Sequence, residues 1–78
     1  MSIPVWFLTL PGVMMLDITG PAETLKLAKG AFSPRYIGPQ ETVITSTDMT
    51  ISQIEPLPET LPDGSLLVVP GSFDSTVW

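Results

Sequence analysis

The stretch PGVMMLDITGPAE, residues 11–23, decides how this chain folds. Before it, residues 3–10 (IPVWFLTL) are dense in β-branched and aromatic side chains, which favour a parallel strand buried on both faces. Pro11 and Gly12 end that strand, because proline lacks a ladder donor and glycine accepts turn dihedrals. The stretch therefore leads from a buried strand into a loop whose single carboxylate, Asp17, has apolar neighbours.

A short helix is predicted over residues 21–29. Gly20 and Pro21 are typical of an N-cap and a first helical position, because proline has no N–H for the first turn to leave unsatisfied. Glu23 is then the third helical residue, where a carboxylate bonds back to the cap and meets the positive end of the helix dipole. This order of strand, loop and helix places Asp17 at the C-terminal edge of a sheet, where open α/β folds bind ligands.

The remainder of the sequence predicts short strands joined by turns. Residues 35–38 are expected to form a second strand, and residues 42–46 and 49–52 a small hairpin. Several prolines in residues 53–65 predict an extended connector with little regular structure. Residues 65–69 (SLLVV) are the clearest strand, and their apolar character again favours an interior parallel position.

The composition excludes several functions. The 78 residues allow one small domain at most, and the absence of cysteine and histidine removes the thiolate nucleophile and the commonest general base and zinc ligands. A net charge of −5 argues against direct contact with nucleic acid. The sequence has no apolar run long enough to span a bilayer and no basic segment of a secretory signal at its start. We therefore expect a cytoplasmic chain without membrane contact, metal or cofactor.

Asp17 and Gly71 are the candidate site residues. Asp17 either bonds loop amides and caps the helix, as aspartate does in turns, or acts as an acid or base at the sheet edge. Gly71 either ends the preceding strand or presents its backbone N–H to an anion. No nucleophile accompanies either residue. The other carboxylates considered lack metal-ligand spacing and are expected to be solvated: Asp48, Glu55, Glu59, Asp63 and Asp74.

The pattern Phe7-Leu-x-x-Pro-Gly-Val-x-x-Leu-Asp-Ile-Thr-Gly-Pro-x-Glu-x-Leu-x-x-Ala28 resembles the opening of a PfpI-superfamily domain. This superfamily is the class I glutamine amidotransferase-like group that includes the parkinsonism-associated protein. Residues 36–38, 43–46 and 66–71 resemble the strands that follow, so the likeness covers essentially the whole chain. The most similar branches are the amidase-like sensor domains of AraC-type transcription regulators and the isonitrile hydratases.

The resemblance implies a flavodoxin-like three-layer α/β sandwich with a mostly parallel sheet and a site at its C-terminal strand edge. In isonitrile hydratases the aspartate that matches Asp17 works beside a cysteine on a strand-to-helix elbow, and the glycine that matches Gly71 lies by the same pocket. That elbow would follow well after Gly71, so residues 1–78 are expected to be an N-terminal fragment with an incomplete sheet. Ser72 stands where hydratases commonly have a second glycine, which favours the regulator branch.

Three functions remain open. The first is a truncated ligand-sensing domain of an AraC-type regulator, which binds a small molecule and has no catalytic activity of its own. The second is a fragment of an isonitrile hydratase-like enzyme. The third is a small interaction protein that dimerises through its open sheet. Because one helix cannot cover both faces of a parallel sheet, residues 3–10 and 65–69 are expected to leave apolar surface bare and to promote self-association.

Overall fold

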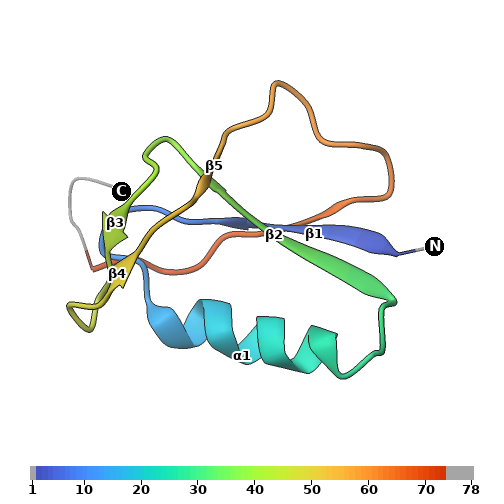
Figure 1. The fold of residues 1–78 in the computed structure, drawn as a ribbon, viewed down its shortest axis with the longest axis horizontal. Helices are drawn as coiled ribbons and strands as arrows, with labels where there is room; N and C mark the ends of the chain where they lie inside the picture. Colours follow the sequence, from blue (N-terminus) through green and yellow to red (C-terminus); the bar gives the residue numbers. More distant parts are fainter. Residues whose placement is uncertain (1, 74–78) are drawn as a thin grey trace.

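A computed structural model describes residues 2–73 of the chain (Figure 1). In chain order the elements are β1 (Ile3–Leu8), α1 (Met15–Lys26), β2 (Phe32–Gly38), β3 (Val43–Ile44), β4 (Thr50–Ile51), β5 (Glu55–Pro56) and β6 (Leu66–Val68). A four-stranded parallel sheet has the order β5-β2-β1-β6, and β3 pairs with β4 as an antiparallel hairpin. The predicted α/β class with a mostly parallel sheet is confirmed, as an incomplete flavodoxin-like sandwich.

The strand β1 lies at the centre of the sheet, as its apolar sequence predicts. It pairs with β2 along its whole length and with β6 from Val5 to Phe7. Val5, Trp6 and Phe7 are buried, while the strand ends at Leu8, before the predicted limit. Apolar side chains on successive residues point to opposite faces, so β1 contributes to packing on both sides of the sheet.

The prediction of an interior position for residues 65–69 is wrong for the described chain. The strand β6 pairs in parallel with β1, but no strand of residues 2–73 pairs with its other side. Leu66 and Leu67 are consequently 49% and 52% exposed. An apolar strand sequence predicts burial, but an interior position also requires a paired strand on each side. Among the described residues, β6 has a paired strand on one side only.

The helix α1 begins at Met15, six residues before the predicted start, so Pro21 lies inside the helix and Gly20 is not its N-cap. Pro21 removes the N–H that would bond to the Asp17 carbonyl, at a cost of roughly 3 kcal/mol. Ile18, in the added turns, is only 5% exposed, and burying such a side chain contributes roughly 1.5–3 kcal/mol. Burial of Ile18 therefore offsets most of the proline cost.

The main core lies between α1 and one face of the sheet. It is built from buried side chains of the strands, the helix and the loops: Val5, Phe7, Val13, Ile18, Val43 and Ile54. The Tyr36 ring stacks on Phe7 with its centroid 5.4 Å away. In Figure 1, α1 lies below the strands, and the connector that follows β5 loops away above them. One helix layer thus covers one face, as the incomplete sandwich requires.

The hairpin and the connector follow the sequence prediction. The paired segments β3 and β4 are shorter than expected, and Asp48 takes a positive φ of 65° in the turn between them. The connector over residues 53–65 contains only β5, which pairs with the end of β2. Asp74, one of the carboxylates expected to be solvated, lies outside the described residues. Ser72 forms an isolated antiparallel bridge with Val13.

Candidate functional site

Three segments meet at the C-terminal ends of the strands: residues 11–14, 43–46 and 71–73, which together we call the edge loops. The Met14 N–H donates to the Gly71 carbonyl at 2.9 Å, and the Phe73 N–H donates to the Gly12 carbonyl at 3.0 Å. On the other side, the Gly12 N–H donates to the Ile44 carbonyl at 2.8 Å. Residues 11–14 therefore lie between the hairpin and residues 71–73, and backbone hydrogen bonds connect them to both segments.

The two candidate residues of the sequence analysis are in direct contact. The Gly71 N–H donates to Asp17 Oδ2 at 2.9 Å, across 54 positions of sequence. A Cβ atom on Gly71 would lie 3.2 Å from that oxygen and 3.0 Å from Met14 Sδ. Glycine is thus the residue that lets the carboxylate reach this amide without displacing either neighbour.

The anion that the Gly71 N–H binds in this structure is the Asp17 carboxylate of the same chain. Asp17 lies in the first turn of α1, where the positive end of the helix favours a carboxylate. Its bond to a loop amide matches the first of the two roles that the sequence analysis gave for this residue. A charge-assisted hydrogen bond of this kind contributes roughly 1.5–3 kcal/mol when it is shielded from water. A role of Asp17 or Gly71 in binding a ligand or in catalysis stays a prediction.

An open hollow of about 840 Å³ adjoins the edge loops. Its lining combines hydroxyl, amide and carboxylate groups with apolar side chains: Pro11, Gly12, Gln40, Thr42, Val43, Ile44, Thr45, Ser46, Asp48 and Phe73. Sequence reasoning missed this hollow and treated Asp48 as a solvated residue only. The run Thr45-Ser-Thr-Asp48 in a predicted hairpin turn is the signal that could have indicated it, because such turns present short polar side chains.

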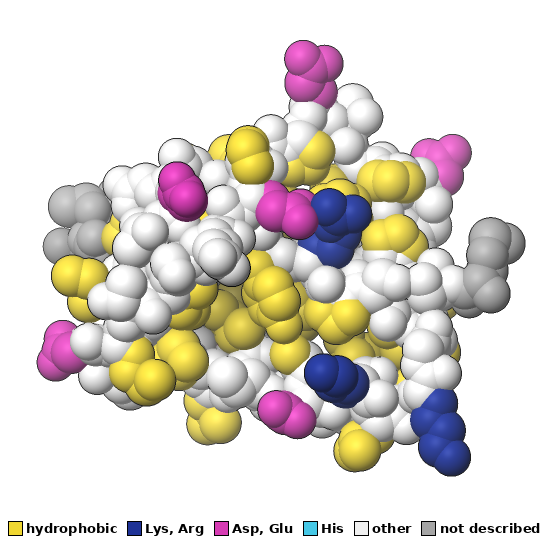
Figure 2. All heavy atoms as spheres, in the orientation of Figure 1, with side chains coloured by type: hydrophobic (Ala, Val, Ile, Leu, Met, Phe, Trp, Pro, Cys, Tyr) yellow, Lys and Arg dark blue, Asp and Glu magenta, His cyan; other side chains and the backbone are white. Residues whose placement is uncertain are grey.

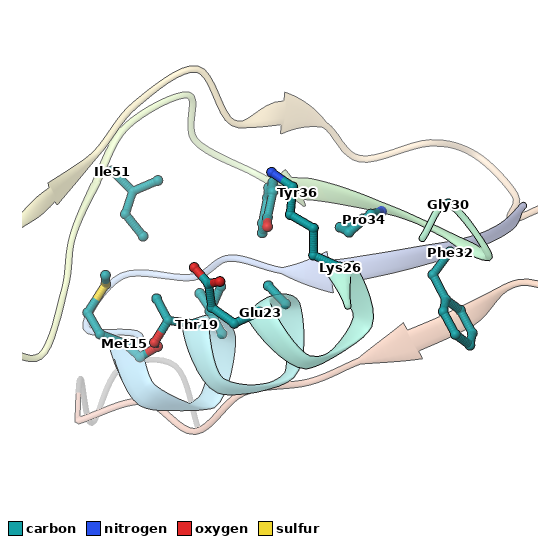
Figure 3. A pocket seen from close by; sticks show the side chains of 11 residues that line it. Met15, Thr19, Glu23, Lys26, Gly30, Phe32, Pro34, Tyr36 and Ile51 are labelled. Carbon is teal, nitrogen blue, oxygen red and sulfur yellow. The ribbon is translucent and has the colours of Figure 1, made fainter. Parts of the chain in front are cut away.

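A second groove, of about 640 Å³, follows the flank of α1 against β2 and β4 (Figure 3). Its walls are mostly apolar, with Met15 and Ile51 at one end and Phe32 towards the other. Glu23 and Lys26 line it from the helix. The expectation that Glu23 caps the helix is therefore wrong, because the earlier start of α1 places this residue in the helix interior, on the rim of the groove.

The outer strand β5 carries an ion pair that the sequence analysis did not anticipate. Arg35 Nη2 lies 2.8 and 3.0 Å from the two carboxylate oxygens of Glu55, so Glu55 is paired as well as solvated. The Arg35 guanidinium also stacks over the Trp6 ring, 5.2 Å from its centroid. Both side chains of the ion pair are about half-exposed.

Charge is dispersed over the face of the molecule that Figure 2 shows. Acidic and basic side chains are scattered over this face, and hydrophobic side chains gather in the groove between α1 and the strands. Within residues 2–73, no three acidic side chains lie close enough together to hold a metal ion. No helix in the same range has the length and apolar character needed to cross a bilayer.

Comparison with known proteins finds a likeness among solved structures. No family model matches the sequence, and no curated protein matches it. Among solved structures, the crystal structure of an AraC family transcriptional regulator from Pseudomonas putida is similar to 94% of this chain, with a TM-score of 0.78 and 19% identity. The chain spans 49% of that regulator's chain, about half of its length. At this identity the likeness shows a shared fold; membership of the PfpI superfamily stays a prediction.

Proposed function

We propose that residues 1–78 form the N-terminal part of the ligand-sensing domain of an AraC-type transcription regulator, and that they have no catalytic activity of their own. The observation that carries the proposal is the fold shared with about half of the Pseudomonas putida regulator, at a TM-score of 0.78. The arrangement of the edge loops supports it, because the C-terminal ends of parallel strands are where open α/β folds bind ligands.

The hollow beside the edge loops is the proposed ligand site. Its volume falls in the range of small-molecule sites, and its lining offers hydroxyls from Thr45 and Ser46 and a carboxylate from Asp48. Among the described residues that line it, none is lysine or arginine. A neutral or cationic polar molecule therefore suits the hollow better than an anion does.

Ligand binding there would act on the edge loops. The hollow is walled by the hairpin and by residues 11–12, and the Gly12 amide is bonded to Ile44 of the same hairpin. A ligand that contacts both segments holds them together, so it stabilises the folded chain by an amount that rises with the logarithm of its concentration relative to its Kd. The backbone bonds of residues 12–14 to residues 71–73 would carry this constraint to the end of β6.

The test is a thermal-shift and titration calorimetry screen of the 78-residue chain against neutral, cationic and anionic polar compounds of low mass. We expect a neutral or cationic compound to raise the unfolding midpoint, and Asp48→Asn to weaken its binding. Asparagine tolerates the positive φ of residue 48, so this variant removes the charge and retains the turn. Asp63→Asn, at an exposed position away from the hollow lining, is the matched control.

Two results would contradict the proposal. In the first, binding is equally strong in Asp48→Asn and in the control variant. In the second, the chain converts an alkyl isonitrile and water into the N-substituted formamide, and Asp17→Asn abolishes that reaction. The second result would favour the isonitrile hydratase-like alternative.

A further inference from the structure

The turn between β3 and β4 holds a carboxylate in an unfavourable backbone conformation. Asp48 has a φ of 65°, in the left-handed region that favours glycine. Aspartate tolerates this region because its side chain can bond to nearby backbone groups. Within residues 2–73, however, the Asp48 carboxylate forms no hydrogen bond and no ion pair, unlike the carboxylates of Asp17 and Glu55. The side chain of Asp48 therefore does not account for the conformation of its own backbone.

Thr45, at the start of the turn, supplies the bonds that fix it. The Thr45 N–H donates to the Met49 carbonyl at 2.8 Å, and the Thr45 carbonyl accepts the Asp48 N–H at 3.1 Å. The Thr45 hydroxyl oxygen accepts the N–H of Met49 at 3.2 Å and the N–H of Thr47 at 3.4 Å. Thr45 is only 3% exposed, so water competes weakly for these bonds. One buried threonine thus bonds to each of the three residues 47–49.

The Thr45 hydroxyl and the Asp48 carboxylate have different tasks in this turn. A hydroxyl has two lone pairs and one hydrogen. Both lone pairs of the Thr45 hydroxyl accept backbone N–H groups, and Thr47 Oγ1 lies 3.3 Å away, where it can accept the hydrogen. In this structure the hydroxyl is therefore engaged within the turn, whereas the Asp48 carboxylate lies on the lining of the hollow without a partner among residues 2–73.

We propose that Thr45 is a positioning residue of the ligand site: its hydroxyl keeps residue 48 left-handed and so keeps the Asp48 carboxylate at the hollow, where it meets a cationic group of the ligand. This inference rests on the function proposed above. Glycine at position 48 would serve the turn better, because it takes a positive φ without steric cost. Strain of this kind is typical of functional sites. Asp48 is the one charged side chain among the described residues of the lining, so a primary ammonium group is the chemistry that it would select.

The first experiment needs no ligand. Nuclear magnetic resonance follows the φ of residue 48 through the coupling of its amide and α protons, and follows the hydrogen exchange of the Met49 amide. Thr45→Val removes the hydroxyl, so residue 48 should leave the left-handed region and the Met49 amide should exchange about three- to tenfold faster. Thr45→Ser keeps the hydroxyl and should behave as the unmodified chain does. Thr60→Val, the same substitution at an exposed position of the connector, is the matched control.

The second experiment measures the binding of ethanolamine, a small primary ammonium compound, by titration of the hairpin amide resonances. Asp48→Gly should raise the unfolding midpoint of the chain and abolish this binding. Thr45→Val should weaken the binding about three- to tenfold, and Thr45→Ser should restore it. In an Asp48→Asn background, Thr45→Val should have little further effect on affinity, because the carboxylate that it positions is absent. A threonine with a merely structural role would weaken binding equally in both backgrounds.

The two experiments separate this inference from the proposed function. The inference is overturned if residue 48 keeps its φ in Thr45→Val, if Asp48→Gly lowers the unfolding midpoint, or if Thr45→Val acts equally with and without the Asp48 carboxylate. Binding of other polar compounds but not of ethanolamine overturns the choice of a cationic ligand and leaves the proposed function standing. If no compound binds, the proposed function fails, and the ligand-free experiment still decides whether Thr45 positions Asp48.

Discussion

The two outer strands of the sheet, β5 and β6, differ in the features that prevent an edge strand from pairing with another strand. The β5 edge is short and combines Pro56 with the Arg35–Glu55 ion pair, whereas the β6 edge exposes leucine on both faces. Both strands flank the same pair of inner strands, β2 and β1. The comparison teaches that β5 has the features that keep a strand at the edge of a sheet, whereas β6 leaves backbone groups and apolar side chains that a further strand could cover.

The largest expected effect comes from the strand between the two edges. Phe7 is fully buried in β1, and Phe7→Ala should lower the free energy of unfolding by about 3–5 kcal/mol through lost burial and an unfilled cavity. Because β1 pairs directly with β6 and with β2, both edges should be lost together. Denaturant unfolding followed by circular dichroism measures this change. If the variant folds with nearly the original stability, the pairing of the outer strands does not depend on the packing of Phe7 in the core.

The next effect concerns the contact that fixes the end of β6. Asp17→Ala leaves the Gly71 amide without its acceptor and should lower the free energy of unfolding by about 1.5–3 kcal/mol. Asp17→Asn retains an acceptor without the charge and should cost less. Denaturant midpoints of the two variants, with Asp63→Asn as an exposed control, measure the difference. Equal stability of Asp17→Ala and the control would mean that this bond does not hold the edge loops.

A third prediction removes the protection of the β5 edge. Pro56→Val supplies the missing backbone donor and a β-branched side chain, so the sheet should gain a second edge that can pair. The stability change should be below about 1 kcal/mol, but light scattering should detect larger species than the unmodified chain forms. Pro58→Val, in the connector outside the strand, is the control. If both variants scatter alike, the proline in β5 does not protect this edge.

The smallest effect belongs to the ion pair itself. Arg35 and Glu55 are about half-exposed, so solvent screens their attraction, and Glu55→Gln should cost about 0–1 kcal/mol. A double-mutant cycle with Arg35→Gln in low and high salt isolates the pairwise energy, which should decrease as salt is added. A coupling energy that is large and independent of salt would mean that the pair stabilises the sheet core as well as its edge.

The sequence predicts those parts of the fold that local chemistry determines. The β-branched and aromatic residues of 3–8 and the turn residues between 44 and 50 give a strand and a hairpin by their own preferences. The helix start was mispredicted because Gly20-Pro21 is a strong local signal, whereas the burial of Ile18 against the sheet is a tertiary effect. The position of β6 was mispredicted because an apolar strand does not specify how many neighbours it has.

The candidate site was predicted only where local sequence features indicate it. Asp17 and Gly71 were each identified from local features, an acid among apolar residues and a glycine that ends a strand. Their direct hydrogen bond joins positions 54 residues apart, and no spacing in the sequence encodes it. The hollow beside the hairpin was missed because it forms only when residues 11–12 and Phe73 are brought beside the hairpin.

The pairing of β1 with β6 also has a consequence for the order of folding. Val5 is aligned with Leu66, so the central strand acquires its second neighbour only after residue 66 has been synthesised and a very long loop has closed. Contacts between residues so distant in sequence slow the folding of a domain, because the entropy of loop closure is lost before the contact forms. On the ribosome, β1, α1 and β2 can assemble first, and one side of β1 stays unpaired until β6 has been synthesised.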